Sequence, residues 1–124
     1  MREIKFRAWH NDFGEMVYTG KNYEFGKREF TPFLFEVGFS NYPQSDWVIM
    51  QYTGLKDKDG KEIYESDIDQ DGGRIFYNES IAAFQIDYGG DVDIADMEDV
   101  DKWMVVSGNI YESPELLNPL NKQS

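Results

Sequence analysis

Short segments in which apolar and polar residues alternate recur along this chain. In "REIKFRAW", near the N-terminus, Ile4, Phe6 and Ala8 share one face, while Lys5 and Arg7 take the other. Alternation with a period of two is typical of a strand with one buried face. The turn residues of "HNDFGE" are followed by "MVYTG", which indicates a returning strand. The N-terminus is therefore predicted to form a β-hairpin.

Further strands are predicted along the rest of the chain. The stretch "FTPFLFEVGF" is less regular, and Pro32 restricts it to an edge strand or to a start after the proline. Asp59-Gly60 is a two-residue hairpin signal, because glycine tolerates positive φ at no steric cost. "ESPELLNP" indicates a short helix that Ser113 would cap. The remaining predicted strands are "WVIMQYTG", "EIYESDI", "GGRIFYN", "IAAFQIDY" and "WMVVSGNIY".

The short-strand rhythm predicts a mainly β fold (all-β or α+β) of the small-barrel kind. At 124 residues, the chain fits a single domain, with residues 1–50 as an N-terminal β extension and residues 51–124 as the barrel. The chain has no cysteine, which excludes disulfides, thiolate nucleophiles and cysteine-based zinc sites. The charged start "MREIKFRAW" predicts no signal peptide, and no apolar run is long enough to span a bilayer. We therefore expect a cytoplasmic protein without a membrane partner.

Charge is distributed unevenly along the chain. Residues 1–64 hold 9 Lys/Arg and 10 Asp/Glu, whereas residues 65–124 hold 3 Lys/Arg and 14 Asp/Glu, for a net charge of −11 in the second half. Such an acidic surface repels phosphate backbones, so direct binding of nucleic acid is not expected. It favours solubility or a basic protein partner.

Three blocks of sequence together resemble the YopX family, whose members are small proteins of phages, prophages and other mobile elements of bacteria. They are "REIKFRAW", "MQYTGLKDKDGKEIYESDI" and "SGNIYESPELL", at residues 2–9, 50–68 and 107–117. The chain departs from the usual family pattern at His10, where Asp is usual, at Ser66, where Gly is usual, and at Ser107, where Ile is usual.

The resemblance implies an N-terminal β element joined to a C-terminal barrel of the Src-homology 3 type, and a phage or prophage origin in a bacterial host cell. It supplies no reaction, cofactor or catalytic residue. If the family's glycine needs positive φ, Ser66 must tolerate that conformation or the turn must adjust.

The stretch "DIDQDGGRIFYNE" begins like a calcium-binding EF-hand loop. Asp67, Asp69 and Asp71 occupy positions 1, 3 and 5, and a glycine occupies position 6. Position 12 holds Asn78 instead of a bidentate Glu, position 8 holds Arg74, and the flanking segments are strand-like. An acidic turn is the favoured interpretation, and no metal site is predicted.

The segment "DVDIADMEDVD" is the candidate interaction surface. It is interpreted either as a solvated loop or short helix that protects a sheet edge, or as a surface for a basic protein. A line of carboxylates can also imitate the DNA backbone and occupy a nucleic-acid-binding protein. Its acids are Asp91, Asp93, Asp96, Glu98, Asp99 and Asp101.

Catalytic constellations are weak in this sequence. His10 is the only histidine, lies among turn residues and is interpreted as a surface residue. The enzymatic alternative is a metal-assisted hydrolase that uses Asp67, Asp69 or the acids of the 91–101 segment. The leading hypothesis is a non-enzymatic protein-interaction module without a cofactor. Its partner would be a host or phage protein, and a homo-oligomer is left open.

Overall fold

The computed structural model of this chain is mainly β, as predicted from the alternation. The chain divides into two compact units, Met1–Gln51 and Tyr52–Ser124, which are described separately below. None of the helices within the described residues is long and apolar enough to cross a bilayer. The described residues are 5–11, 14–18, 23–25, 28–30, 47–90 and 93–117.

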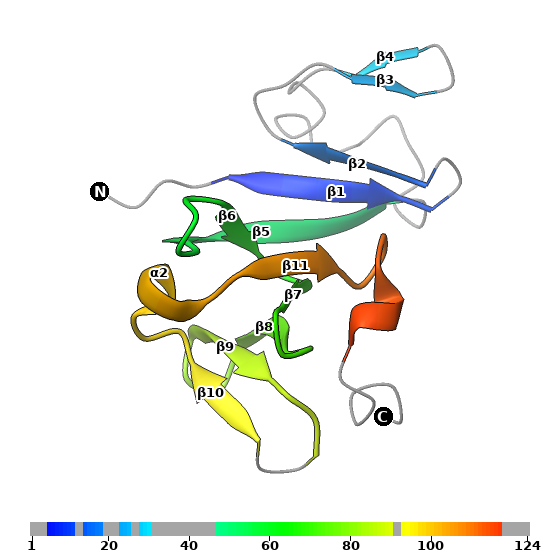
Figure 1. The fold of residues 1–124 in the computed structure, drawn as a ribbon. Helices are drawn as coiled ribbons and strands as arrows, with labels where there is room; N and C mark the ends of the chain where they lie inside the picture. The colour runs from blue at the N-terminus through cyan, green and yellow to red at the C-terminus, as the bar shows by residue number, and fades with distance from the viewer. Residues whose placement is uncertain are drawn as a thin grey trace. The chain divides into compact units, whose positions relative to one another are not determined.

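The N-terminal unit contains the predicted hairpin (Figure 1). Strand β1 (Phe6–His10) pairs antiparallel with β2 (Glu15–Tyr18) and, on its other side, with the first half of β5 (Trp47–Lys56). Strands β3 (Tyr23–Phe25) and β4 (Arg28–Phe30) form an antiparallel pair of their own. The stretch "FTPFLFEVGF" lies outside the described residues beyond Phe30.

The predicted alternation of β1 is wrong at Arg7. This side chain is 3% exposed, and its neighbour Ala8 is fully buried. The reason is that β1 is a central strand, so Arg7 has a partner on both sides, opposite Tyr18 and opposite Met50. The long aliphatic stem of arginine tolerates such burial where a short charged side chain would not.

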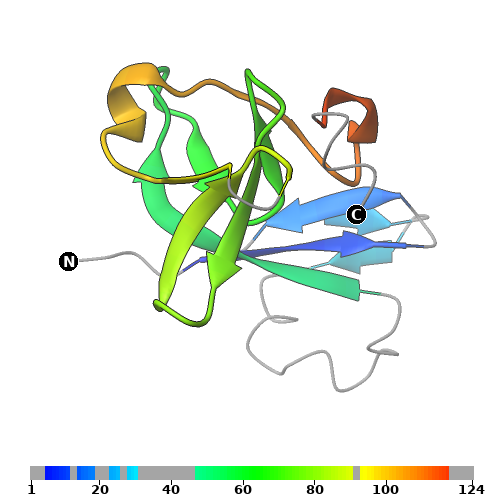
Figure 2. The ribbon, with the colours of Figure 1, turned by 90° about the horizontal axis from the view of Figure 1, so that it is seen from below.

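The C-terminal unit is built on a five-stranded antiparallel sheet in the order β10-β9-β8-β7-β11. The sheet is strongly curled and barrel-like (Figures 1 and 2). The second half of β5 pairs with β6 (Glu62–Tyr64) in the same unit. The bounds of the five strands are Asp67–Asp69 for β7, Arg74–Asn78 for β8, Ala83–Asp87 for β9, Ile94–Asp96 for β10 and Val106–Asn109 for β11.

The core of the C-terminal unit is a cluster of aliphatic side chains from the sheet, β6 and helix α2 (Val100–Trp103). Ile75 and Ile86 face each other across β8 and β9, so the sheet contributes the centre of the cluster. The members of the cluster are Ile63, Ile75, Ile86, Val100, Met104 and Val106.

The predicted C-terminal helix is a single 3₁₀ turn, η2 (Pro114–Leu116). Capping by the Ser113 side chain, predicted from the sequence, is wrong, because no such hydrogen bond forms. Instead, the backbone carbonyl of Ser113 accepts from the N–H of Leu116 at 3.0 Å. In so short a turn this backbone bond satisfies the donor that a cap would otherwise receive.

Candidate functional site

Strand β5 carries a β-bulge in the half that pairs with β6. Tyr52 lies opposite Tyr64 and Lys56 lies opposite Glu62, so four steps along β5 match two steps along β6. Between these pairs, Gly54 has a φ of 87°, a left-handed conformation that glycine adopts without the steric cost of a Cβ. The bulge therefore interrupts the regular alternation of buried and exposed side chains.

Thr53 satisfies backbone groups at this bulge. Its Oγ1 donates to the carbonyl oxygen of Ile63 at 2.8 Å and accepts from the N–H of Leu55 at 3.2 Å. Thr53 itself is buried, whereas the Leu55 side chain is 39% exposed. The bulge therefore directs the apolar side chain of Leu55 toward solvent while Thr53 remains inside.

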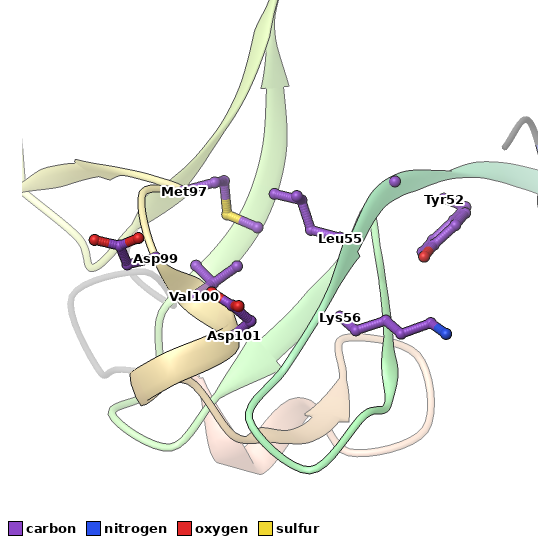
Figure 3. Close-up of a pocket in the computed structure, with 8 residues that line it drawn as sticks. Tyr52, Leu55, Lys56, Met97, Asp99, Val100 and Asp101 are labelled. Carbon is purple, nitrogen blue, oxygen red and sulfur yellow. The ribbon is translucent and has the colours of Figure 1, made fainter. Parts of the chain in front are cut away.

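An open pocket of about 390 Å³ lies between the bulge of β5 and helix α2 (Figure 3). Its apolar surface comes from Leu55, Met97 and Val100. Val100 belongs to the core cluster and is only 2% exposed, so this side of the pocket is anchored in the interior. The other lining residues are Tyr52, Gly54, Lys56, Asp99 and Asp101.

Two carboxylates lie on the α2 side of the pocket. Asp99 precedes α2 in a left-handed conformation (φ 56°), and its side chain makes no capping hydrogen bond. Its Oδ1 lies 3.8 Å from the Nζ of Lys102, and both side chains are exposed, so this ion pair contributes little to stability. Asp101 follows in the first turn of α2 and is exposed.

The predicted acidic surface forms a strand, a turn and a helix, where a loop or short helix was predicted. Ile94–Asp96 is the edge strand β10, and only Val100–Trp103 is helical. The edge is held partly by side chains, since the Oδ1 of Asp96 accepts from the amide of Gln85 at 2.9 Å. Asp91 lies outside the described residues. The other five acids are exposed, and these are Asp93, Asp96, Glu98, Asp99 and Asp101.

The first two aspartates of the calcium-like stretch point into the fold. Asp67 is 2% exposed, and its Oδ2 accepts from the N–H of Tyr64 at 2.8 Å. Asp69 is 1% exposed; its Oδ1 accepts from the N–H of Gly73 at 2.9 Å, and its Oδ2 accepts from the hydroxyl of Tyr88 at 2.6 Å. The Asp69 carboxylate holds the turn between β7 and β8, whereas the Asp67 carboxylate holds the connection between β6 and β7. A calcium ion would have to displace their donors.

The third aspartate, Asp71, is exposed at the tip of this turn. Burial raises the pKa of Tyr88, and the hydrogen bond to Asp69 and the negative charge of Asp69 raise it further. Within the described residues, no group of three or more His, Cys, Asp or Glu is arranged to hold a metal ion.

Asp57 has a similar role that the sequence did not indicate. It lies in the loop between β5 and β6, where the predicted Asp59-Gly60 turn forms as part of a five-residue connection, residues 57–61. Its Oδ1 accepts from the N–H groups of Asp59 and Lys61, and its Oδ2 accepts from the N–H of Val106, each at 2.9 Å. The Asp57 carboxylate thus ties this loop to β11.

The environment of Asp57 sets its titration. Burial alone would raise the pKa, but the three backbone N–H donors and the charge of Lys61 outweigh it. The pKa of Asp57 therefore lies below its ordinary value. The fold therefore stabilises the ionised carboxylate of Asp57 relative to its protonated form.

The interpretation of His10 as a surface residue is wrong. Its side chain is 6% exposed, and its ring packs edge-on against the ring of Trp47, with centroids 4.6 Å apart. The cause is again the central position of β1, which pairs His10 with Trp47 on β5.

The pocket itself was missed by the sequence reasoning. The one signal for it was Gly54 inside an otherwise β-branched and aromatic strand, because an isolated glycine within a strand indicates a bulge. The approach of Leu55 on β5 to Met97 and Val100 joins segments more than 40 positions apart, which no local pattern encodes.

The comparisons with known proteins agree with the blocks found in the sequence. The family model of the YopX protein matches residues 5–118. The chain belongs to the YopX family. No curated protein matches the chain. A solved structure, the crystal structure of protein EF1440 from Enterococcus faecalis, is 26% identical and aligns with a TM-score of 0.61, covering 94% of this chain and 99% of that one.

The fold answers the question that the YopX pattern raised at Ser66. Ser66, at the position where glycine is usual in the family, has a φ of 71°. Its N–H donates to the carbonyl oxygen of Ile75 at 2.8 Å, and its carbonyl accepts from the N–H of Ile110 at 3.0 Å. Serine here adopts a left-handed conformation in which a glycine would carry no steric cost.

Proposed function

We propose that this YopX-family protein is a non-enzymatic interaction module of phage or prophage origin, and that its acidic segment binds a basic region of a host or phage protein. The acidic segment is defined here as residues 93–101. The observation that carries the proposal is the exposure of all five acids of this segment on one continuous strand, turn and helix. Their backbone has defined secondary structure, which favours recognition of the acids in a fixed arrangement.

The charge of the second half of the chain supports a basic partner. Its net charge of −11 attracts positively charged proteins over a distance and raises the rate of their encounter. The same charge repels nucleic acid and like-charged proteins. Electrostatics of this kind gives selectivity for partners even where each exposed ion pair adds little affinity.

The arrangement of the buried acids supports a non-enzymatic role. Asp57, Asp67 and Asp69 all accept hydrogen bonds from neighbouring groups of the fold. Carboxylates used in this way stabilise turns, and a hydrolytic role for Asp67 and Asp69 would require them to leave these donors.

The test is affinity capture from a lysate of the bacterial host with two variants of equal charge. The segment variant neutralises three acids of the acidic segment, and the remote variant neutralises three exposed acids elsewhere. Serine replaces aspartates that precede glycine, since asparagine before glycine deamidates. The segment variant is Glu98→Gln, Asp99→Asn and Asp101→Asn; the remote variant is Asp59→Ser, Asp71→Ser and Glu79→Gln.

We expect the wild type and the remote variant to retain the same stoichiometric basic protein and the segment variant to lose it. Equal retention by both variants would contradict the proposal. Duplex DNA is then added to the retained complex. Release of the partner by DNA would identify the acidic segment as a mimic of the DNA backbone, whereas no release would leave an ordinary protein interface.

A further inference from the structure

We infer that the pocket between the β5 bulge and α2 receives one arginine or lysine side chain of the partner. The aliphatic stem lies on Leu55 and Met97, and the cationic head lies beside Asp101. This inference rests on the proposed function, because it specifies how the acidic segment recognises its basic partner.

The apolar surface of the pocket matches the stem of such a side chain. Lysine and arginine bury their methylene groups along apolar surfaces while the charged head stays in water. Leu55 and Met97 point toward one another across the pocket (Figure 3). Met97 is half-buried against the core, and its flexible thioether adapts to the shape of what it contacts.

The α2 side of the pocket supplies the opposite charge. Asp101 is exposed, and its carboxylate makes no hydrogen bond or ion pair with any residue in the described part of the chain. The neighbouring Asp99 already lies near Lys102. Asp101 is therefore the carboxylate that is open to a cation from a partner, with Asp99 adding to the local potential.

Lys56 is the one cation that lines the pocket. Its position bears on whether the occupant is a cationic or an anionic side chain. Its side chain extends away from the two acids, toward Tyr52 (Figure 3). The ammonium of Lys56 therefore lies apart from Asp99 and Asp101, and the charge on the α2 side of the pocket is negative. Charge complementarity on that side favours a cationic occupant.

The experiment is an NMR titration of the full-length ¹⁵N-labelled protein with a short peptide, acetyl-Gly-Gly-Arg-Gly-Gly-amide. A second peptide carries citrulline, which keeps the stem and shape of arginine without its charge, and a third carries glutamate. We expect saturable, millimolar binding of the arginine peptide that shifts the amides of residues 54–56 and 97–101. The citrulline peptide should bind roughly two- to fivefold more weakly, as expected for one exposed charge pair.

Variants then assign the two parts of the site. Asp101→Asn should weaken the arginine peptide roughly two- to fivefold and leave the citrulline peptide unchanged. Leu55→Thr, a strand-compatible polar replacement, should weaken both peptides. The control is Asp93→Asn, which removes an equal charge from an exposed acid outside the pocket and should change neither.

Three results would overturn the inference: no localised shifts at about 20 mM arginine peptide, equal affinity for the arginine and citrulline peptides, or tighter binding of the glutamate peptide with loss on Lys56→Gln. None of these three results changes the outcome expected of the capture experiment. If the captured partner still depends on the acidic segment while Leu55→Thr leaves its affinity unchanged, the proposed function stands and the pocket inference fails.

Discussion

Ser66 adopts a left-handed backbone conformation that residues with a Cβ disfavour. Hydrogen bonds to Ile75 on one side and Ile110 on the other fix its backbone at a φ of 71°. A left-handed conformation costs a residue with a Cβ roughly 1–2 kcal/mol, and the surrounding strands supply that energy. A glycine would adopt the same backbone conformation without this cost.

We predict that Ser66→Gly stabilises the protein by about 0.5–1 kcal/mol, because relief of the left-handed strain exceeds the extra backbone entropy of glycine in the unfolded chain. Urea unfolding monitored by tryptophan fluorescence measures the change. The control is Ser107→Gly in strand β11, where the same replacement should destabilise by a similar amount. Destabilisation by Ser66→Gly would contradict this account of the turn.

Asp57 is the residue on which the loop between β5 and β6 depends. We predict that Asp57→Asn lowers the free energy of unfolding by about 2 kcal/mol, because an amide cannot accept all three N–H donors and presents a donor to one of them. Urea unfolding at neutral pH checks this value. Asp59→Ser, at an exposed position in the same loop, should change it by less than about 0.5 kcal/mol.

The lowered pKa of Asp57 makes this stabilisation depend on pH. The ionised form is favoured in the folded state, so its contribution is complete well above the ordinary pKa of 3.8 and is lost as the pH falls through the lowered folded-state value. We predict that the difference in unfolding free energy between wild type and Asp57→Asn is constant from about pH 7 to pH 5 and shrinks below about pH 4. A difference that grows on acidification would show that the sign is wrong.

Asp69 and Tyr88 explain a motif that looks like a calcium loop. The carboxylate of Asp69 accepts hydrogen bonds from the N–H groups of Asp71 and Gly73 and from the hydroxyl of Tyr88. We therefore predict that a calorimetric titration detects no calcium binding tighter than about 1 mM, the weak end for such loops. Tyr88→Phe should instead destabilise the protein by roughly 1.5–3 kcal/mol, since it removes a hydrogen bond to a buried carboxylate. Calcium binding that is lost on Asp69→Asn would contradict this assignment.

At the scale of elements, the bulge of β5 depends on Thr53. We predict that Thr53→Val, which keeps the shape but removes Oγ1, lowers the free energy of unfolding by about 1–3 kcal/mol, because the buried carbonyl of Ile63 loses its donor. Thr53→Ser keeps the hydroxyl and should cost less. A larger loss in Thr53→Ser than in Thr53→Val would mean that the methyl group, and not the hydrogen bonds, holds the bulge.

The elements differ in how far the sequence could predict them. Strands such as Arg74–Asn78 and Ala83–Asp87 carry β-branched and aromatic residues between turn residues, and local pattern suffices for them. Strand β10, Ile94–Asp96, was missed because its composition is that of an acidic loop, and its pairing with β9 is what makes it extended. Propensity is a weak guide for a three-residue edge strand.

The candidate site was predictable only in part, because it depends on contacts between segments that are distant in the sequence. The acids of the acidic segment could be named from composition, since runs of like charge are solvated. The pocket beside them requires the left-handed backbone at Gly54 and Asp99 and the packing of β5 against α2. The inward direction of Asp57 and Asp69 likewise depends on N–H donors from distant segments, such as Val106.

At the scale of the whole molecule, the two halves of the chain differ in charge, and the acidic half contains the acidic segment. If opposite charge drives recognition, affinity must fall as salt screens it, with a Debye length of about 10 Å at 0.1 M salt and about 3 Å at 1 M. The loss of affinity with salt should be smaller for the segment variant, because it lacks the charges that the partner recognises. The remote variant, which lacks as many charges elsewhere, should lose affinity with salt as the wild type does.

The most direct test of the central claim is the dissociation constant of the captured partner for wild type, segment variant and remote variant, measured by calorimetry at low and high salt. We predict that the segment variant binds at least about tenfold more weakly at low salt and responds less to salt, whereas the remote variant stays within about twofold of the wild type. Equal weakening of binding by both variants would show that net charge alone attracts the partner. It would contradict the assignment of the acidic segment as the recognition surface.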